Sequence, residues 1–246
     1  MTNKRVEDDF EAVVVEALRS FRDEIEVTRF VSGSDGGWSV DEASARYERV
    51  IWRHPEIFYV NNVRTFNWRK LSDGRLANVK ITKIPYAIEP DEYPARATEL
   101  EASVAAALAT LDGADGDADR ARRLHDFILA HCQYDRRGLT EKTPLCRTAY
   151  DALVRGRAVC EGYVMAYRLL LDRAGIESDV AVSETMNHCW NVVNVNGAWR
   201  HVDVTRDDPT YEVRLRLRER LTSHRYFLLS DRRLSAKGHH DWHLIG

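Results

Sequence analysis

The sequence predicts an α+β fold, in which helices and an antiparallel sheet occupy different stretches of the chain. Three observations carry this prediction. In several segments apolar residues recur at steps of three and four, as they do on one face of a helix. Other segments alternate apolar and polar residues, as in half-exposed strands. An Asn-Gly pair at residues 196–197 separates two β-rich runs, which is a strong signal for an antiparallel hairpin.

The first half of the chain is predicted to form a mixed α/β subdomain. Its expected elements are a helix over 6–25, a glycine-rich turn at 33–37, a helix from Ser39 to about 54, strands over 57–68 and 76–84, and a helix over 97–111. Ser39 and Glu42 have the spacing of a capping box, which fixes the start of the second helix. His54-Pro55 ends it, because proline disfavours a helical residue before it.

The stretch DGADGDAD at residues 112–119 is predicted to be a linker, because it is small, polar and contains glycine. We therefore expect an N-terminal subdomain over residues 1–115 and a second domain over residues 116–246. The second domain is expected to contain helices over 120–131, 145–154 and 160–174, followed mostly by strands.

The composition is that of an ordinary globular protein. The 246 residues are 44% hydrophobic and 30% charged, and the net charge of −3 gives no electrostatic basis for nucleic acid or an anionic membrane as a partner. No apolar run is long enough to cross a bilayer, and acidic residues at 7–9 argue against a signal peptide. The four cysteines show no CxxC pairing, which argues against a zinc knuckle. Without a secretion signal, we expect reduced thiols and a cytoplasmic protein.

Cys160 stands at the predicted start of a helix with a long apolar face. The face consists of Cys160, Tyr163, Val164, Tyr167, Leu170, Leu171 and Ala174, and Gly175 is a natural stop. A thiol in the first turn of a helix tends to have a lowered pKa, because the helix dipole there favours negative charge. A buried cysteine is more commonly a small core residue, so a partner base has to decide between the two interpretations.

The hairpin around Asn196-Gly197 supplies such a base. If these two residues form the loop, Val195 pairs with Ala198 and the register runs outward to pair Trp190 with Asp203 and His188 with Thr205. His188, Trp190, Val192, His201 and Asp203 then share one face, and Cys189 lies on the other face with a set of valines. His188 and Asp203 become diagonal neighbours, close enough for an imidazole–carboxylate hydrogen bond.

Cys160, His188 and Asp203 have the residue types of a nucleophile, a base and an orienting acid. A thiol needs a base to accept its proton, and the base needs a third group that fixes its tautomer. Spacing alone leaves open the alternative that His188 and Asp203 form a solvated surface pair and that Cys160 belongs to the core.

Three blocks of the sequence resemble the transglutaminase-like superfamily of papain-like cysteine enzymes. They are GRAVCEGYVMAYRLLLDRAGIES at 156–178, NHCWNVVNVNGAWRHVDVTRDDP at 187–209 and HRYFLLSDRRL at 224–234, with a looser likeness through HPEIFYV at 54–60. The likeness is strongest to a bacterial branch that also resembles the domain of a fungal cytokinesis protein. Ala158, where such domains often have glycine, and Arg206, where an aromatic residue is common, depart from the pattern.

The resemblance implies a fold in which the helix that begins at the cysteine packs on an antiparallel sheet. It also implies a triad of Cys160 as nucleophile, His188 as base and Asp203 as orienting acid. The expected reaction is acyl transfer from an amide, either a peptide bond or a glutamine side chain, through a thioester that ends in hydrolysis or transamidation. The partner would be a protein or peptide substrate. An alternative is an interaction module that kept the fold and lost turnover.

Other residues have weaker claims to a role. Trp190 could line an acyl pocket or cover the hairpin, and Tyr134 could reach the oxyanion or simply pack. His239, His240 and His243 near the C-terminus could ligate a metal, although we expect no metal site and no cofactor. Asp207 and Asp208 precede Pro209 and are expected to lie in a turn.

Overall fold

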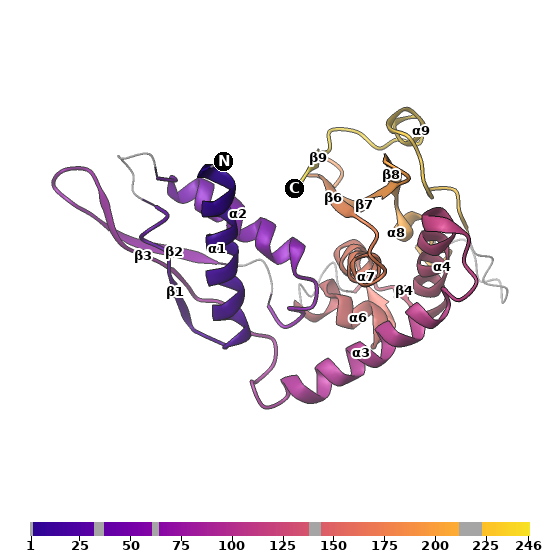
Figure 1. Cartoon of the computed structure of the whole chain (residues 1–246), viewed down its shortest axis with the longest axis horizontal. Helices are drawn as coiled ribbons and strands as arrows, with labels where there is room; N and C mark the ends of the chain where they lie inside the picture. The colour runs from indigo at the N-terminus through magenta and orange to yellow at the C-terminus, as the bar shows by residue number, and fades with distance from the viewer. Residues whose placement is uncertain (1, 32–36, 61–63, 138–143, 212–222) are drawn as a thin grey trace. The chain divides into compact units, whose positions relative to one another are not determined.

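Helices and antiparallel strands build two separate units, residues 1–90 and residues 91–246 (Figure 1). The computed structural model describes residues 2–31, 37–60, 64–137, 144–211 and 223–246. Most of the glycine-rich turn predicted at 33–37 lies outside the described residues, as do residues 61–63 of the first predicted strand.

The first unit combines two helices with a three-stranded antiparallel sheet. Its elements are α1 (Thr2–Arg19), β1 (Glu24–Glu26), α2 (Val40–Arg53), β2 (Thr65–Lys70) and β3 (Leu76–Thr82), with the strand order β1-β3-β2. The predicted capping box of Ser39 and Glu42 is confirmed. The first helix ends earlier than predicted, because Phe21 adopts a left-handed φ of 50° and the chain turns into β1. The strand predicted over 57–68 begins only at Thr65.

The second unit is a helical layer on a four-stranded antiparallel sheet, which confirms the predicted α+β class. Its elements are α3 (Tyr93–Ala109), α4 (Gly116–His131), β4 (Gln133–Tyr134), the 3-10 turn η1 (Pro144–Arg147), α6 (Ala149–Leu153), β5 (Arg157–Ala158), α7 (Cys160–Arg173), β6 (Ser178–Ser183), β7 (His188–Val195), β8 (Ala198–Val202), α8 (Val204–Asp207), α9 (Asp231–Ser235) and β9 (His243–Leu244). The sheet order is β8-β7-β6-β9, and β4 and β5 form a short parallel pair.

Helix α3 belongs to the second unit, so the boundary falls at residue 90 rather than at the predicted residue 115. The Ser103 hydroxyl donates to the Leu153 carbonyl at 2.8 Å, and Glu101 forms an ion pair with Arg173 of α7 at 2.7 Å. The predicted linker is only a turn between two helices of one layer, and its last residues already belong to α4. The polar, glycine-containing stretch at 112–119 therefore forms a turn between two helices and not a domain boundary.

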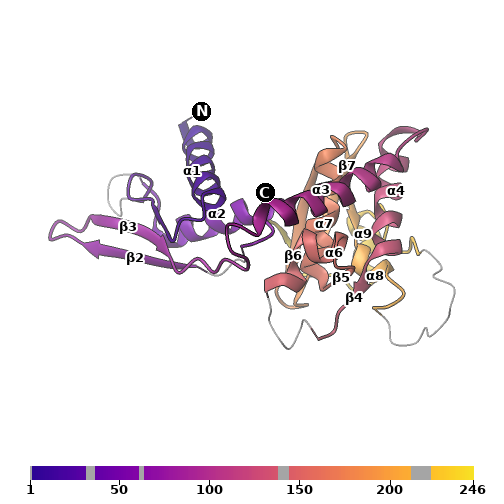
Figure 2. The ribbon, with the colours of Figure 1, turned by 90° about the horizontal axis from the view of Figure 1, so that it is seen from below.

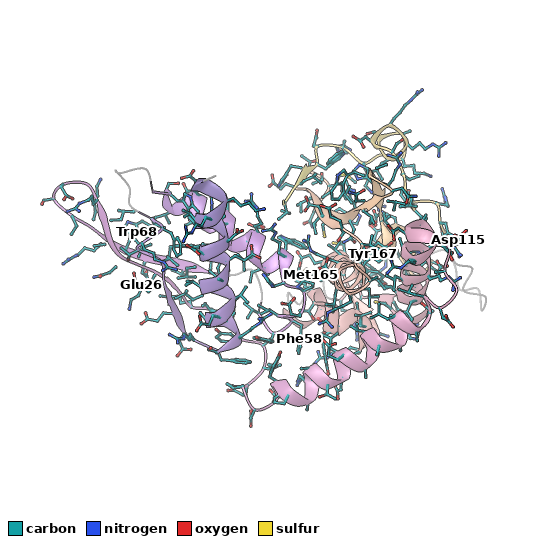
Figure 3. All side chains as sticks on the ribbon, in the orientation of Figure 1. Glu26, Phe58, Trp68, Asp115, Met165 and Tyr167 are labelled. Carbon is teal, nitrogen blue, oxygen red and sulfur yellow. The ribbon has the colours of Figure 1, made fainter. Side chains whose placement is uncertain are left out.

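Helix α7 is buried on both sides, between the sheet and the other helices (Figures 1 and 2). On the sheet side, the Asn191 side-chain amide of β7 donates to the Val164 carbonyl at 3.1 Å. On the α4 side, the hydroxyl of Tyr167, labelled in Figure 3, donates to the Ala121 carbonyl at 2.9 Å. Gly175, with a φ of 71°, lies just beyond the C-terminal end of the helix, as the sequence predicts. This two-sided packing fixes the position of Cys160, the first residue of α7.

The segment after β8 covers the other face of the sheet. Trp190, Val192 and Ala181 of the sheet pack in one cluster with Leu229 and Leu234, and Tyr226 and Trp242 lie against it. The expectation of mostly strand after the hairpin is wrong for the described part of this segment. Asp203 and Ser230 each accept a backbone N–H and cap the short helices α8 and α9, so β9 is its one further strand. No helix that the structure describes is long and apolar enough to cross a membrane.

The first turn of α7 depends on Gly162 lacking a side chain. A Cβ at this position would lie 2.6 Å from the Ala158 Cβ and 3.2 Å from the Thr148 carbonyl oxygen. We therefore expect Gly162→Ala to lower the free energy of unfolding by roughly 1–3 kcal/mol, the usual cost of overpacking. Adding Ala158→Gly removes the closest contact and should restore part of the loss in a denaturant titration. A variant as stable as the parent would contradict this account of the turn.

Candidate active site

Cys160 is the first residue of α7 and is partly exposed, whereas the other three cysteines are buried. Val159, which precedes it, is held by its N–H donating to the Cys146 carbonyl at 3.0 Å. The first N–H groups of a helix have no carbonyl of a preceding turn to bond, so they favour negative charge beside them. The thiol thus lies where a thiolate is stabilised, as the sequence predicts.

His188 is the first residue of β7, and the hairpin register brings it near Asp203. The predicted pairs Val195–Ala198, Asn194–Trp199 and Val192–His201 are confirmed. The two outermost predicted pairs do not form, because β8 ends at Val202 and the chain turns into α8. Asp203 is the N-cap of that helix, and its Oδ1 accepts the Arg206 N–H at 3.0 Å.

The imidazole–carboxylate contact predicted from the hairpin is present. His188 Nε2 lies 2.7 Å from Asp203 Oδ2, and both side chains are buried. A carboxylate can only accept, so Nε2 carries the hydrogen and Nδ1 is the ring nitrogen left for the Cys160 thiol. Asp203 therefore fixes the His188 tautomer, which a base acting on a thiol requires.

Two neighbours stabilise negative charge on the Cys160 sulfur. A hydrogen bond from the Cys189 thiol is the larger influence, and together with the hydrogen bond and positive charge of His188 it outweighs burial. The pKa of Cys160 is consequently well below its usual value. The pKa of the Cys189 thiol is raised in turn, because it donates to Cys160 and is buried. Cys160 carries the thiolate of this pair, since it is the partly exposed cysteine at the helix start.

The charge on His188 is stabilised in the same way. Burial alone would lower its pKa, but the charge and hydrogen bond of Asp203, assisted by Cys160, raise the pKa to about 10. Burial would raise the pKa of Asp203, yet His188 and a second histidine, His239, hold it below its usual range. The arrangement therefore favours a thiolate, an imidazolium and a carboxylate in one row.

Sequence reasoning missed two residues of this site. Cys189 was assigned to the core face of the hairpin, but its thiol contacts the Cys160 sulfur. His239 was considered only as a metal ligand, but its Nε2 lies 2.8 Å from Asp203 Oδ2. For Cys189 the sequence did contain a signal, because this residue directly follows His188. No sequence signal connected residue 239 with residue 203, because a long stretch of chain separates them.

The two predicted substrate-binding residues differ in position. Trp190 is 1% exposed, and its indole N–H donates to His201 Nδ1 at 3.0 Å, so we assign it to packing and not to a substrate pocket. Tyr134 is half-buried, and its ring lies 4.7 Å from that of Tyr211. Burial, and after it the negative charge of Cys160, raises the pKa of Tyr134.

The C-terminal histidines do not act together in the described part of the chain. His239 is buried against Asp203, His240 is exposed and contacts the Gly238 carbonyl, and His243 is exposed in β9. Among the described residues, two groups have donor atoms within 4.8 Å of one another, namely His188, Asp203 and His239, and His125, Asp126 and His224. In both groups the short distances from histidine nitrogens to carboxylate oxygens are those of hydrogen bonds.

Asp207 and Asp208, which the sequence predicts as turn residues before Pro209, are buried anchors at the short helix α8. Asp207 accepts from Ser223 Oγ at 2.7 Å, from the Tyr226 N–H at 3.1 Å and from His125 Nε2 at 3.3 Å. Asp208 accepts the Tyr163 hydroxyl. The prediction failed because it was based on residue type before a proline, whereas the short helix α8 turns both side chains inward.

The stretch that contains the site matches a known protein family. Residues 104–204 match the family model of the transglutaminase-like superfamily. This stretch is a transglutaminase-like domain. It contains Cys160, His188 and Asp203, and the fold of the second unit is transglutaminase-like and papain-like. No curated protein matches the sequence.

Several solved structures share parts of this fold at low identity. A TGase is 11% identical with a TM-score of 0.41, covering 65% of this chain and 48% of its own. A proposed cysteine protease from Cytophaga hutchinsonii is 14% identical with a TM-score of 0.36, covering 61% and 64%. A proposed protease from Parabacteroides distasonis is 13% identical with a TM-score of 0.35, covering 56% and 35%. The matches span less than two thirds of each of these structures.

The electrostatics of Cys160 predict selective alkylation. Its lowered pKa favours the thiolate of Cys160, whereas burial raises the pKa of Cys132 to about 12 and keeps that thiol neutral near pH 7. Because only the thiolate reacts, we expect iodoacetamide to label Cys160 at least about 100-fold faster than Cys132 near pH 7. Peptide mass mapping of the alkylated chain measures both rates. Equal labelling of the two cysteines would show that Cys160 is not activated.

The contacts of Asp207 predict a loss of stability on substitution. Asp207→Asn replaces one acceptor oxygen of a buried side chain by a donor, so one of its three partners loses its hydrogen bond. We expect the free energy of unfolding to fall by roughly 1–3 kcal/mol, the usual cost of an unsatisfied buried polar group. The alkylation rate of Cys160 in the folded protein should change little, because Asp207 touches neither His188 nor Cys160. Unchanged stability would restore the interpretation as a turn residue.

Proposed function

We propose that the second unit catalyses acyl transfer from an amide through a thioester on Cys160. One observation carries the proposal: a partly exposed cysteine at a helix start contacts a buried histidine whose other ring nitrogen lies 2.7 Å from a buried carboxylate. The amide is a peptide bond or a glutamine side chain of a protein or peptide. We also propose that the protein belongs to the bacterial branch of the transglutaminase-like superfamily that its sequence resembles.

The first half-reaction uses the charges that the site already holds. The Cys160 thiolate attacks the carbonyl carbon and forms the carbon–sulfur bond. His188 then gives its Nδ1 proton to the leaving nitrogen as the carbon–nitrogen bond breaks, and an amine departs. Asp203 remains ionised and holds the imidazole in its orientation.

In the second half-reaction the neutral His188 accepts a proton from water or from an amine. The deprotonated acceptor attacks the thioester carbonyl and the Cys160 thiolate leaves, which restores the thiolate–imidazolium pair. Water gives hydrolysis, and an amine gives transamidation. The Cys160 N–H, free of an intrahelical carbonyl partner, is a donor for the developing oxyanion, and Tyr134 is the nearby side chain that we propose for contact with the acyl group.

The opposing hypothesis is an interaction module with the same fold and no turnover. Such a protein would tolerate a Cys160 that is sealed in the core or separated from His188. The partial exposure of Cys160 and its contact with His188 favour the enzyme.

A substrate screen tests the proposal directly. The full chain is incubated with glutamine-containing peptides and a fluorescent primary amine, and the products are read by mass. Amine incorporation indicates a transamidase, replacement of an amide NH₂ by OH indicates deamidation, and chain cleavage indicates a peptidase. Cys160→Ala should abolish each of these products. If no product or acyl-enzyme forms on the parent protein with any peptide, the module is the better description.

Asp203→Asn should reduce turnover on the substrate found, and because Asp203 is buried among three donors the turnover is measured per folded molecule. Asparagine can present a donor to His188 and favour the wrong tautomer, a change that costs about 10⁴ in serine-protease triads. A cysteine enzyme already holds its thiolate–imidazolium pair, so we expect a smaller loss of about 10²–10³.

Asp241→Asn is the matched control for Asp203→Asn. Asp241 is exposed and has a left-handed φ of 50°, which asparagine also tolerates. Its turnover should equal that of the parent. If the two variants have the same turnover, Asp203 does not take part in catalysis.

A further inference from the structure

His239 contacts the same carboxylate oxygen as His188. Its Nε2 lies 2.8 Å from Asp203 Oδ2, while His188 Nε2 lies 2.7 Å from that atom on its other side. His239 is 2% exposed and comes from the loop after α9, far along the chain from both partners. We propose that His239 is a positioning residue, which holds the Asp203 carboxylate in the orientation that His188 needs. This inference rests on the acyl-transfer function proposed above.

The hydrogen bonds around Asp203 leave little freedom to its carboxylate. Oδ2 accepts from His188 and His239, and Oδ1 accepts the Arg206 N–H. Because a carboxylate only accepts, both histidines present N–H at Nε2. Without His239, Oδ2 would be held only by the residue that it has to orient. His239 therefore holds the Asp203 carboxylate in place, and the carboxylate in turn orients His188.

The surroundings of His239 hold its ring rigidly. The Trp190 indole packs edge-on against it, with ring centroids 4.7 Å apart, and the Tyr226 ring lies 5.6 Å away. Its Nδ1 is buried and has no hydrogen-bond partner. The ring therefore uses Nε2 to donate to Asp203, while its Nδ1 meets no partner among the described residues. His239 thus has one polar contact among them, and that contact is the Asp203 carboxylate.

This assignment also explains the burial of Trp190. Its ring covers His239, and its N–H is used by His201 Nδ1 at 3.0 Å. Of the two roles that the sequence left open for Trp190, a pocket wall or a cover of the hairpin, the packing against His239 favours the cover. The row runs from His239 through Asp203 and His188 to Cys160.

The test compares glutamine and asparagine at position 239, whose side-chain amides differ in length by one methylene group. In His239→Gln the side-chain amide nitrogen takes the place of Nε2 and can still donate to Asp203. In His239→Asn the amide nitrogen takes the place of Nδ1, too short to reach. The measurement is the rate of Cys160 alkylation by iodoacetamide on the full chain, as a function of pH. This readout needs no substrate and reports the fraction of thiolate.

We expect His239→Asn to slow alkylation about 10-fold on the low-pH side of the profile, because a loosened Asp203 stabilises the imidazolium less and the pKa of Cys160 rises. The alkylation profile should move to higher pH by about one unit in this variant, and His239→Gln should stay close to the parent. His240→Asn, at the neighbouring exposed histidine, is the control and should match the parent. Equal profiles for the Gln and Asn variants would overturn the inference.

A double-mutant cycle separates positioning from general packing. If His239 acts through Asp203, adding His239→Asn to Asp203→Asn should change the alkylation rate no further. A merely structural role would slow both backgrounds equally and would overturn the inference.

Failure of the inference differs from failure of the proposed function. The proposed function fails if Cys160 of the parent chain reacts no faster than Cys132. The inference alone fails if parental Cys160 is reactive and the His239 variants leave its profile unchanged.

Discussion

A buried negative charge at Asp203 organises the second unit. A carboxylate without solvent is costly unless several donors surround it, and here these donors come from three parts of the chain. The Arg206 N–H comes from helix α8, His188 from the start of β7, and His239 from the segment after α9. The backbone N–H of Asp203 in turn donates to the Tyr226 carbonyl at 3.0 Å. The end of β8, the short helix and the path of the C-terminal segment all meet at this one side chain.

Cys160 is fixed from the opposite face of the same sheet. Helix α7 is buried on two sides, and a side chain at Gly162 would collide with Ala158, so the helix start has one available position. That position places the Cys160 thiol against Cys189, which faces away from Trp190 on β7. His188, at the end of this strand, can reach both the Asp203 carboxylate and the Cys160 sulfur. The sheet separates two packed layers. The site lies at the end of β7 where His188 stands, because groups from both layers come together there.

The distribution of charge follows from this burial. Each group alone would lose its charge in such surroundings, since burial raises the pKa of carboxyl and thiol groups and lowers that of imidazole. In a row, the neighbours reverse each shift: Asp203 and Cys160 titrate below their usual ranges and His188 above its own. The transglutaminase-like domain at 104–204 contains Cys160, His188 and Asp203, but His239 lies beyond it. The proposed support for Asp203 therefore comes from sequence outside the matched domain.

The sequence by itself determined the local elements of the site. The apolar stripe with Gly175 defined the Cys160 helix, and Asn196-Gly197 set the hairpin register that brings His188 close to Asp203, because both patterns depend only on neighbouring residues. Only the tertiary structure decided the domain boundary, the burial of Trp190, Asp207 and Asp208, and the contacts of Cys189 and His239. These depend on which distant segment covers each face of the sheet. Residue type and spacing carry no information on such packing. A polar residue in a short loop is predicted to be exposed, and the sequence does not show that a distant segment of the chain covers it.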